Sequence, residues 1–167
     1  MQRAHLLTAT LFSLASACAS DGPDPDPIGV QASGYLTFEL INARPFPTAQ
    51  HQGNPLVNVW TDELATAPYR ALSVGATGGR DVPVGAMIVK EMMDAGGESP
   101  VLTVMAKQPS GYDPQNGDWW YGRLKPDGSA TNPSFVGKVG FCIGCHSGAS
   151  GSDHLFGVAA DNLTPSP

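Results

Sequence analysis

Glycine and proline interrupt this chain at short intervals. The 167 residues include 20 glycines and 15 prolines, and beyond residue 34 no stretch free of both is longer than Leu56–Ala67. Both residues destabilise the interior of a helix, glycine through its backbone freedom and proline through its missing N–H and its clash with the preceding turn. Helices long enough for a four-helix bundle are therefore excluded, and the core must come mainly from strands.

Strand-like segments lie between the turn-forming residues. Val84–Met93 is followed by a turn with two glycines and then by Val101–Ala106, and Asp118–Leu124 follows a second turn rich in Gly, Asn and Asp. Strands joined by such turns commonly form an antiparallel meander. Leu56–Trp60 is a further strand by its β-branched content and alternation. We therefore predict a mainly β fold of the α+β class, an antiparallel meander with a few short helices.

The remaining segments before the meander are less regular. Thr61 could cap a short helix over Asp62–Ala67, which Pro68 would end. Tyr35–Ile41 suits either a strand or a short helix, and Asn42–Pro55 contains three prolines and a glycine. We expect this last segment to be a loop.

The first residues are typical of an export signal. Arg3 precedes an apolar stretch, Leu6–Ala17, that is too short to span a bilayer comfortably. Small residues before Cys18 resemble the lipobox of bacterial lipoproteins. We expect residues 1–17 to be removed and Cys18 to be lipidated, which implies a periplasmic protein on a lipid anchor, with the outer membrane favoured. The alternative is ordinary cleavage before Cys18, which leaves an odd free thiol.

Residues 18–34 alternate aspartate with proline over part of their length, which favours an extended, solvated tether. We therefore expect the folded domain to span residues 35–167. The formal net charge is −6 and the pI is about 4.9, and the nine Lys and Arg residues are scattered. Without a basic stripe, nucleic acid is excluded as a partner, and membrane contact is expected only through the lipid anchor.

The most specific motif is Cys142-Ile143-Gly144-Cys145-His146. C-x-x-C-H is the attachment motif of c-type haem, in which both cysteine sulfurs form thioethers with the porphyrin and the histidine ligates the iron. A redox C-x-x-C pair would normally open a helix in a βαβ unit, which is absent here. Half of a zinc site would need a second pair of ligands, and no cysteine remains nearby. We therefore predict covalent haem c on Cys142 and Cys145, with His146 as the iron ligand.

The motif lies near the C-terminal end of the chain. Ordinary electron-carrier cytochromes c place it near the N-terminus and supply a distal methionine from further along, but no methionine follows Cys145. Four upstream methionines remain candidates, although strand methionines more often fill cores: Met87, Met92, Met93 and Met105.

Several segments share a pattern with a known family: Asn58-Val-Trp60, Pro83-Val-Gly85-Ala-Met-Ile-Val-Lys90-Glu91, Val104-Met-Ala-Lys107, Gly111-Tyr-Asp-Pro-Gln-Asn-Gly-Asp-Trp119-Trp120, the C-x-x-C-H motif and Asp153-His-Leu-Phe156. Together they resemble the cytochrome P-460 family, related to cytochrome c′-beta, over about residues 56–157. The resemblance implies an antiparallel sheet, one covalent haem per chain and often a homodimer. It also implies an iron with histidine on one side and an open distal position.

In the cytochromes P-460 proper, a lysine of the V-K-E strand is cross-linked to the porphyrin, and the resemblance implies Lys90 for this role. In a strand, Ile88, Lys90 and Met92 share one face, and an ammonium between apolar neighbours is costly to bury. Desolvation would lower its pKa and release a nucleophilic amine. The alternative is an edge lysine that reaches water. Glu91, on the opposite face, is expected to be solvated.

The resemblance also implies a distal pocket with fewer polar groups than catalytic members have. Ungapped counting puts Thr103 where hydroxylamine-oxidising members have a carboxylate, Val57 where they have an arginine, and Val82 where many have an aromatic residue. We therefore expect an apolar pocket that favours neutral ligands such as nitric oxide over multi-proton oxidation. His154 is expected to be an exposed loop histidine rather than a second ligand.

These features predict an exported monohaem c-type cytochrome with an open iron site that binds or redox-transforms hydroxylamine or nitric oxide. Such an oxidoreductase would exchange electrons with a partner protein. The alternative is a non-catalytic gas-binding or electron-transfer cytochrome.

The adjacent aromatics Trp119, Trp120 and Tyr121 cannot all face one side of a strand, and we expect them in the core or at a dimer contact.

Overall fold

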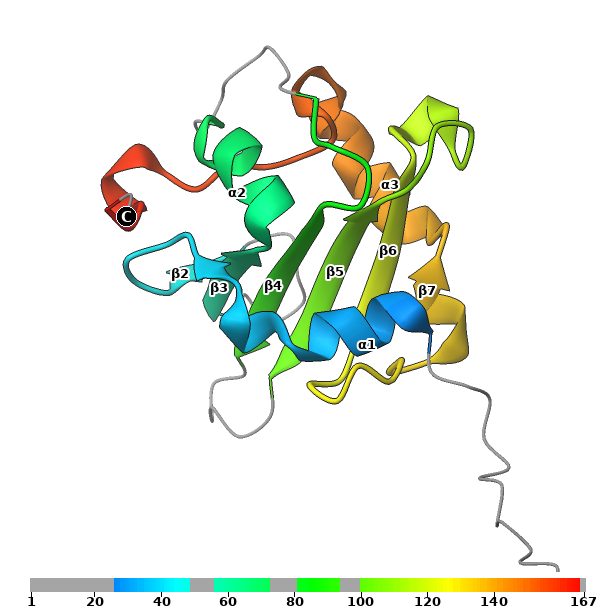
Figure 1. Cartoon of the computed structure of the whole chain (residues 1–167), viewed down its shortest axis with the longest axis horizontal. Coiled ribbons are helices and arrows are strands. Elements are labelled where there is room, and N and C mark those ends of the chain that lie inside the picture. The colour runs from blue at the N-terminus through cyan, green and yellow to red at the C-terminus, as the bar shows by residue number, and fades with distance from the viewer. Residues whose placement is uncertain (1–25, 49–55, 73–80, 94–99, 166–167) are drawn as a thin grey trace, which may run out of the picture.

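The structure, a computed structural model, describes residues 26–48, 56–72, 81–93 and 100–165. Its centre is one sheet of seven strands in the order β1-β3-β4-β5-β6-β7, with β2 also paired to β3, and every pairing is antiparallel (Figure 1). The strands are β1 (Glu39–Leu40), β2 (Phe46–Pro47), β3 (Leu56–Thr61), β4 (Met87–Met93), β5 (Val101–Lys107), β6 (Trp119–Leu124) and β7 (Val136–Gly137). The prediction of a mainly β, antiparallel fold is confirmed.

The helices are short. They are α1 (Pro27–Ser33), α2 (Glu63–Arg70) and α3 (Gly140–His146), with 3₁₀ helices η1 (Tyr35–Thr37), η2 (Pro114–Asn116), η3 (Pro133–Phe135), η4 (Ser147–Ser152) and η5 (Ala160–Asn162). Within the described residues, no helix has the length and apolar character needed to cross a membrane. Cys18 and the expected signal peptide lie outside the described residues.

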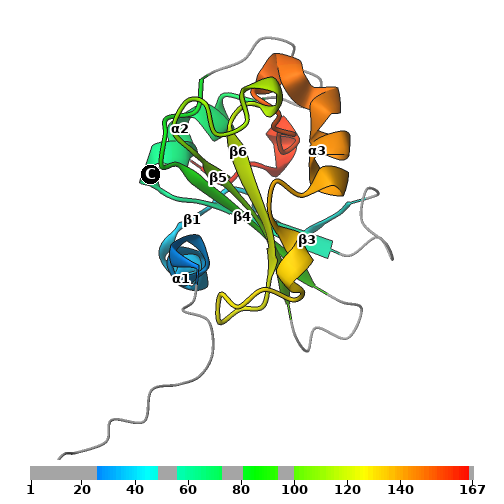
Figure 2. The same ribbon diagram turned by 90° about the vertical axis from the view of Figure 1, so that its right-hand side faces the viewer.

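Both faces of the sheet are covered, and Figure 2 shows α1 and α3 on opposite sides of it. Alternate side chains of β4, β5 and β6 enter two separate clusters. On the α1 face, Val89 and Val104 pack with Trp120, whereas Ile88 and Tyr121 face α3. The three adjacent aromatic residues of β6 are thus divided between two cores, as the period of two along a strand requires.

The predicted tether is wrong over its last residues, because α1 is folded onto the sheet. Asp26 caps this helix by accepting a hydrogen bond from the Ile28 N–H at 2.9 Å, and Pro27 occupies the first turn, where its missing N–H costs nothing. Ala32 is 0% exposed in the α1-face cluster. The folded part therefore includes residues before Tyr35.

The contact between Gly29 of α1 and Gly128 of the β6–β7 connection leaves no room for a side chain. A Cβ at Gly29 would lie 2.4 Å from the Gly128 carbonyl oxygen. We expect Gly29→Ala to destabilise the protein by about 1–2 kcal/mol in urea unfolding, since backbone cannot move aside as a side chain can. Gly34→Ala is the matched control, because its nearest new contact is Gln31 O at 3.5 Å. Equal stability of the two variants would contradict this docking.

The expected solvation of Glu91 is also wrong. On the α1 face its carboxylate accepts hydrogen bonds from Tyr35 Oη at 2.8 Å, Asn58 Nδ2 at 3.0 Å and Trp60 Nε1 at 3.2 Å. Tyr35 and Trp60 also meet edge to face, with ring centroids 5.7 Å apart. The polar network ties η1 to β3 and β4, beside the place where α1 packs.

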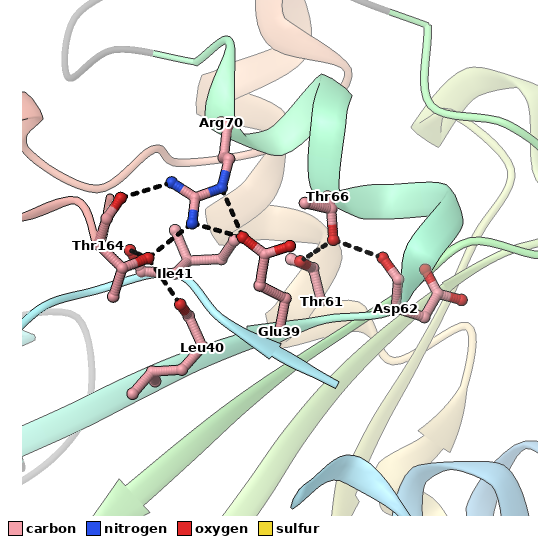
Figure 3. A network of polar contacts seen from close by, with 8 residues as sticks. All are labelled: Glu39, Leu40, Ile41, Thr61, Asp62, Thr66, Arg70 and Thr164. Atoms are coloured by element: carbon pink, nitrogen blue, oxygen red, sulfur yellow. Dashed lines mark hydrogen bonds and ion pairs between the residues drawn. The ribbon is translucent and has the colours of Figure 1, made fainter. Parts of the chain in front are cut away.

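Helix α2 begins one residue later and ends three residues later than predicted. Asp62, not Thr61, caps it by accepting from the Ala65 N–H at 2.9 Å, and Pro68 lies inside the helix, which continues to Arg70. Figure 3 shows what holds this last turn: Arg70 Nε donates to Glu39 of β1 at 2.8 Å, and Arg70 Nη1 donates to the Thr164 carbonyl at 2.8 Å. These side-chain bonds compensate for the backbone bond that proline removes.

The other predicted elements need small changes. Tyr35–Ile41 divides into η1 and β1, so each alternative holds for part of the segment. The expected loop from Asn42 to Pro55 includes the short strand β2, and residues 49–55 lie outside the described part. The strands β3, β4, β5 and β6 confirm the four predicted ones, with ends that differ by a few residues.

Candidate functional site

The C-x-x-C-H motif lies on the short helix α3. Positions i, i+3 and i+4 lie on one side of a helix, so Cys142, Cys145 and His146 project together. Cys142 is half-buried, Cys145 is exposed, and neither forms a disulfide. Burial, followed by the nearby Cys145, raises the pKa of the Cys142 thiol to about 11, so this thiol is protonated at neutral pH.

The three motif side chains line a cleft between α3 and the sheet. It contains about 870 Å³ of space, part of it open to solvent. Lys90 lines the same cleft from β4. The structure thus brings together all four residues that the sequence predicted for the site. Much of the remaining wall is apolar: Ile88, Met105, Phe141, Leu155 and Phe156.

Lys90 is not on an edge strand, so the alternative of an edge lysine is wrong. It lies on β4, between β3 and β5, and pairs in register with Thr103, which in turn pairs with Arg123 of β6. These three residues form a row across the sheet and all line the cleft. Burial lowers the pKa of the Lys90 ammonium, which favours the neutral, nucleophilic amine.

His146 is oriented by a backbone carbonyl. Its Nδ1 lies 2.7 Å from the carbonyl oxygen of His154, and its ring packs against Tyr121 and Phe156 at centroid distances of 5.4 and 5.3 Å. A carbonyl can only accept, so Nδ1 is the donor and the lone pair of the neutral ring is on Nε2. This is the tautomer that a metal ligand bound through Nε2 requires.

The expectation that His154 is exposed is wrong. The residue is 8% exposed, and its backbone, like that of Asp153, has a positive φ, 62° and 51° respectively. A Cβ at Gly117 would lie 2.6 Å from His154 Cδ2, so the ring packs closely on that glycine. The side chain therefore has a packing role, and its carbonyl orients His146.

Buried polar groups, here called the clamp, stabilise the left-handed turn at Asp153 and His154. Lys107 Nζ lies 2.6 and 2.8 Å from the two carboxylate oxygens of Asp153, and the Val82 N–H donates to the same carboxylate at 3.0 Å. Trp119 Nε1 donates to the Asp153 carbonyl at 2.9 Å. The exposed fractions of the Lys107 and Asp153 side chains are only 14% and 11%. The clamp fixes the backbone immediately before the His154 carbonyl.

The cleft is less apolar than expected, because two polar residues of β6 were missed. Arg123 and Tyr121 both line the cleft. Thr103 lies in it as counted, whereas Val57 and Val82 are buried residues that do not line it in the described part of the chain. Alternation along β6 puts Arg123 on the same side as Tyr121, but which side lines the cleft depends on how the strands pair.

Comparison of the chain with protein-family models, with curated proteins and with solved structures finds no match. Within the described residues, no group of three or more His, Cys, Asp and Glu side chains is arranged to hold a metal ion. The chemistry of the cleft is therefore what bears on function. It combines two free thiols, an oriented imidazole, a desolvated amine and an apolar wall.

Proposed function

We propose that this protein carries one covalent haem c in the cleft, with thioether bonds to Cys142 and Cys145 and with His146 as the iron ligand. The observation that carries the proposal is that all three side chains line one cleft, much of whose remaining wall is apolar. Such a wall suits the flat, largely apolar porphyrin ring. The bond from His146 Nδ1 to the His154 carbonyl leaves the imidazole in the tautomer needed for ligation.

Haem bound there would supply an iron centre for binding small nitrogen oxides, such as hydroxylamine or nitric oxide, and for exchanging electrons with a redox partner. The chain's own residues would shape that centre. His146 would donate from one side, and Ile88 and Leu155 would exclude water. Lys90 is the candidate for an additional covalent bond to the porphyrin, where it would tune the ring rather than transfer protons.

The setting follows from the N-terminal residues. With the expected signal peptide and the lipidated Cys18, the protein would be exported and anchored to a membrane facing the periplasm. Covalent haem fits this location, since c-type haem is attached outside the bacterial cytoplasm. The resemblance to the cytochrome P-460 family also implies that two copies of this chain form a homodimer.

A second candidate function is ligand binding or electron transfer without catalysis. Among the described residues that line the cleft, none is Asp or Glu, so the proton-accepting carboxylate of hydroxylamine-oxidising relatives has no counterpart. Met105 also lines the cleft and could serve an electron carrier as a sixth ligand. A low-spin, six-coordinate spectrum would support the carrier and overturn the open iron site.

The test of haem attachment uses the purified full chain. Haem should remain bound after denaturation in the wild type, and Cys142→Ala with Cys145→Ala should abolish that covalent retention. Loss of haem from the wild type on denaturation would contradict the proposal. Hydroxylamine oxidation is then assayed with an artificial electron acceptor. Turnover would support an enzyme, and its absence would support a cytochrome that binds ligands or transfers electrons without catalysis.

The test of Lys90 is the absorption spectrum of the ferrous holoprotein. A strongly red-shifted Soret band that returns to the ordinary position in Lys90→Ala would support a bond from this amine to the porphyrin. Lys125→Ala is the control, because Lys125 is exposed and does not line the cleft. An identical spectrum in wild type and Lys90→Ala would remove the cross-link and leave the thioethers untouched.

A further inference from the structure

The cleft has a charge opposite to that of the whole chain. The protein has a formal net charge of −6, yet no Asp or Glu is among the described residues that line the cleft, and Arg123 supplies a cation there. Two carboxylates of neighbouring segments are engaged elsewhere. Glu91 faces the opposite side of the sheet, and Asp153 pairs with Lys107. The cleft is therefore a positive site in an acidic protein, which favours an anion as its occupant.

Arg123 is available to such an occupant. Its guanidinium makes no hydrogen bond or ion pair with the described residues, although the side chain is half-buried. Thr103 stands beside it in register, and a hydroxyl there adds a donor without neutralising the charge. A guanidinium presents donors in a planar fork that matches two oxygens of one anion. A partly buried cation without a partner is costly, so an incoming anion would remove that cost.

The hydroxyl of Tyr121 gives a second, independent indication. Tyr121 is 2% exposed, and its Oη has no hydrogen-bond partner among the described residues. Buried hydroxyl groups without partners are rare in folded proteins. Tyr121 lies two residues before Arg123, hence on the same face of β6 at a separation of about 7 Å along the strand. Its ring also packs on His146, so the subsite adjoins the proposed iron ligand.

We propose that Arg123 and Tyr121 form an anion subsite beside His146, which takes a small oxyanion with two acceptor oxygens. The inference rests on the proposed function in one respect: it adds anionic nitrogen oxides, with nitrite as the probe, to the occupants of the proposed haem cleft. It does not require a bond to Lys90, since Arg123 keeps its charge in either case. The same two side chains could bind the carboxylates of the porphyrin instead of a free anion. The experiment below distinguishes these two anions.

The test is a titration of the ferric holoprotein with nitrite, followed by absorbance. Arg123→Gln should weaken nitrite binding by about 10-fold or more, because it removes a charge-assisted hydrogen bond. Arg123→Lys should recover part of the affinity, and binding of neutral nitric oxide to the ferrous protein should not change. Unchanged nitrite affinity in Arg123→Gln would overturn the subsite. So would a shift in reduction potential without a change in nitrite affinity, since Arg123 would then be holding the porphyrin carboxylates.

A second pair of variants tests the charge without touching Arg123. Thr103→Glu places a carboxylate in register with Arg123, which should neutralise the guanidinium and weaken nitrite binding to a similar extent. Thr103→Gln has nearly the same size without the charge and should bind nitrite more tightly than Thr103→Glu. Equal nitrite affinity of these two variants would contradict an anion subsite.

The proposed function and the subsite can fail separately. Purified protein without covalent haem would refute the proposed function, and the subsite is then tested in the haem-free chain by the ¹⁵Nε resonance of Arg123. A saturable shift of that resonance with added nitrite supports the subsite, and a resonance that does not move overturns it. Holoprotein with normal haem but equal nitrite affinity in wild type and Arg123→Gln leaves the function standing and refutes the subsite.

Discussion

Replacing Asp153 with asparagine is expected to destabilise the protein by about 3–5 kcal/mol, because it leaves the Lys107 ammonium buried without its counter-charge. Both side chains are largely buried, and the carboxylate also accepts the Val82 N–H. Urea unfolding followed by tryptophan fluorescence measures the loss. The same substitution should loosen the turn that presents the His154 carbonyl to His146. We therefore also expect faster solvent exchange of the His146 Nδ1 proton, measured by ¹⁵N-resolved NMR.

Two controls separate the buried pair from ion pairs in general. Arg44 and Asp161 form an exposed pair at 3.5 Å, with side chains 66% and 80% exposed, so Asp161→Asn should cost at most about 1 kcal/mol. Lys107→Met combined with Asp153→Asn removes the uncompensated charge and should recover part of the stability. A loss for Asp153→Asn no larger than for Asp161→Asn would rule out the clamp.

The strands could be predicted because their signals are local. Turn residues and alternation identify β4, β5 and β6, and strands separated by short turns pair with their neighbours. Helix α1 could not be predicted in the same way. Its composition suits a solvated tether. It is stable because Gly29 fits closely against Gly128 of the distant β6–β7 connection and Ala32 packs in the cluster on the sheet.

The site also combines residues with a local sequence signal and residues whose role depends on distant contacts. The motif on α3 carries its own pattern, so Cys142, Cys145 and His146 were found by spacing alone. Arg123 was missed because its role depends on register across β4, β5 and β6, which places it in a row with Lys90. Register follows from which faces are buried, and no single strand contains that information. His154 was assigned to the surface for a similar reason, since its burial depends on a glycine in a distant turn.

Replacing Glu91 with leucine is expected to destabilise the protein by about 2–4 kcal/mol. The carboxylate accepts hydrogen bonds from Tyr35, Asn58 and Trp60, and leucine would leave these donors without an acceptor under η1. Urea unfolding measures the loss, and Glu91→Gln, which keeps one acceptor oxygen, should lose less. If leucine and glutamine were equally well tolerated, the network would be a surface feature without energetic consequence, and the contact of η1 with the sheet would depend on apolar packing alone.

The Tyr35 hydroxyl gives this network a dependence on pH. Burial, followed by the hydrogen bond to Glu91, raises the pKa of the Tyr35 phenol well above its ordinary value. The folded state therefore holds this proton more tightly than the unfolded chain does, so stability falls as the pH rises above the unfolded value of about 10. Tyr35→Phe should be less stable than wild type near pH 7, and the difference should shrink above about pH 10. Because Tyr69 and Tyr121 are present in both proteins, the difference isolates Tyr35, and a gap that stays constant with pH would refute the raised pKa of this phenol.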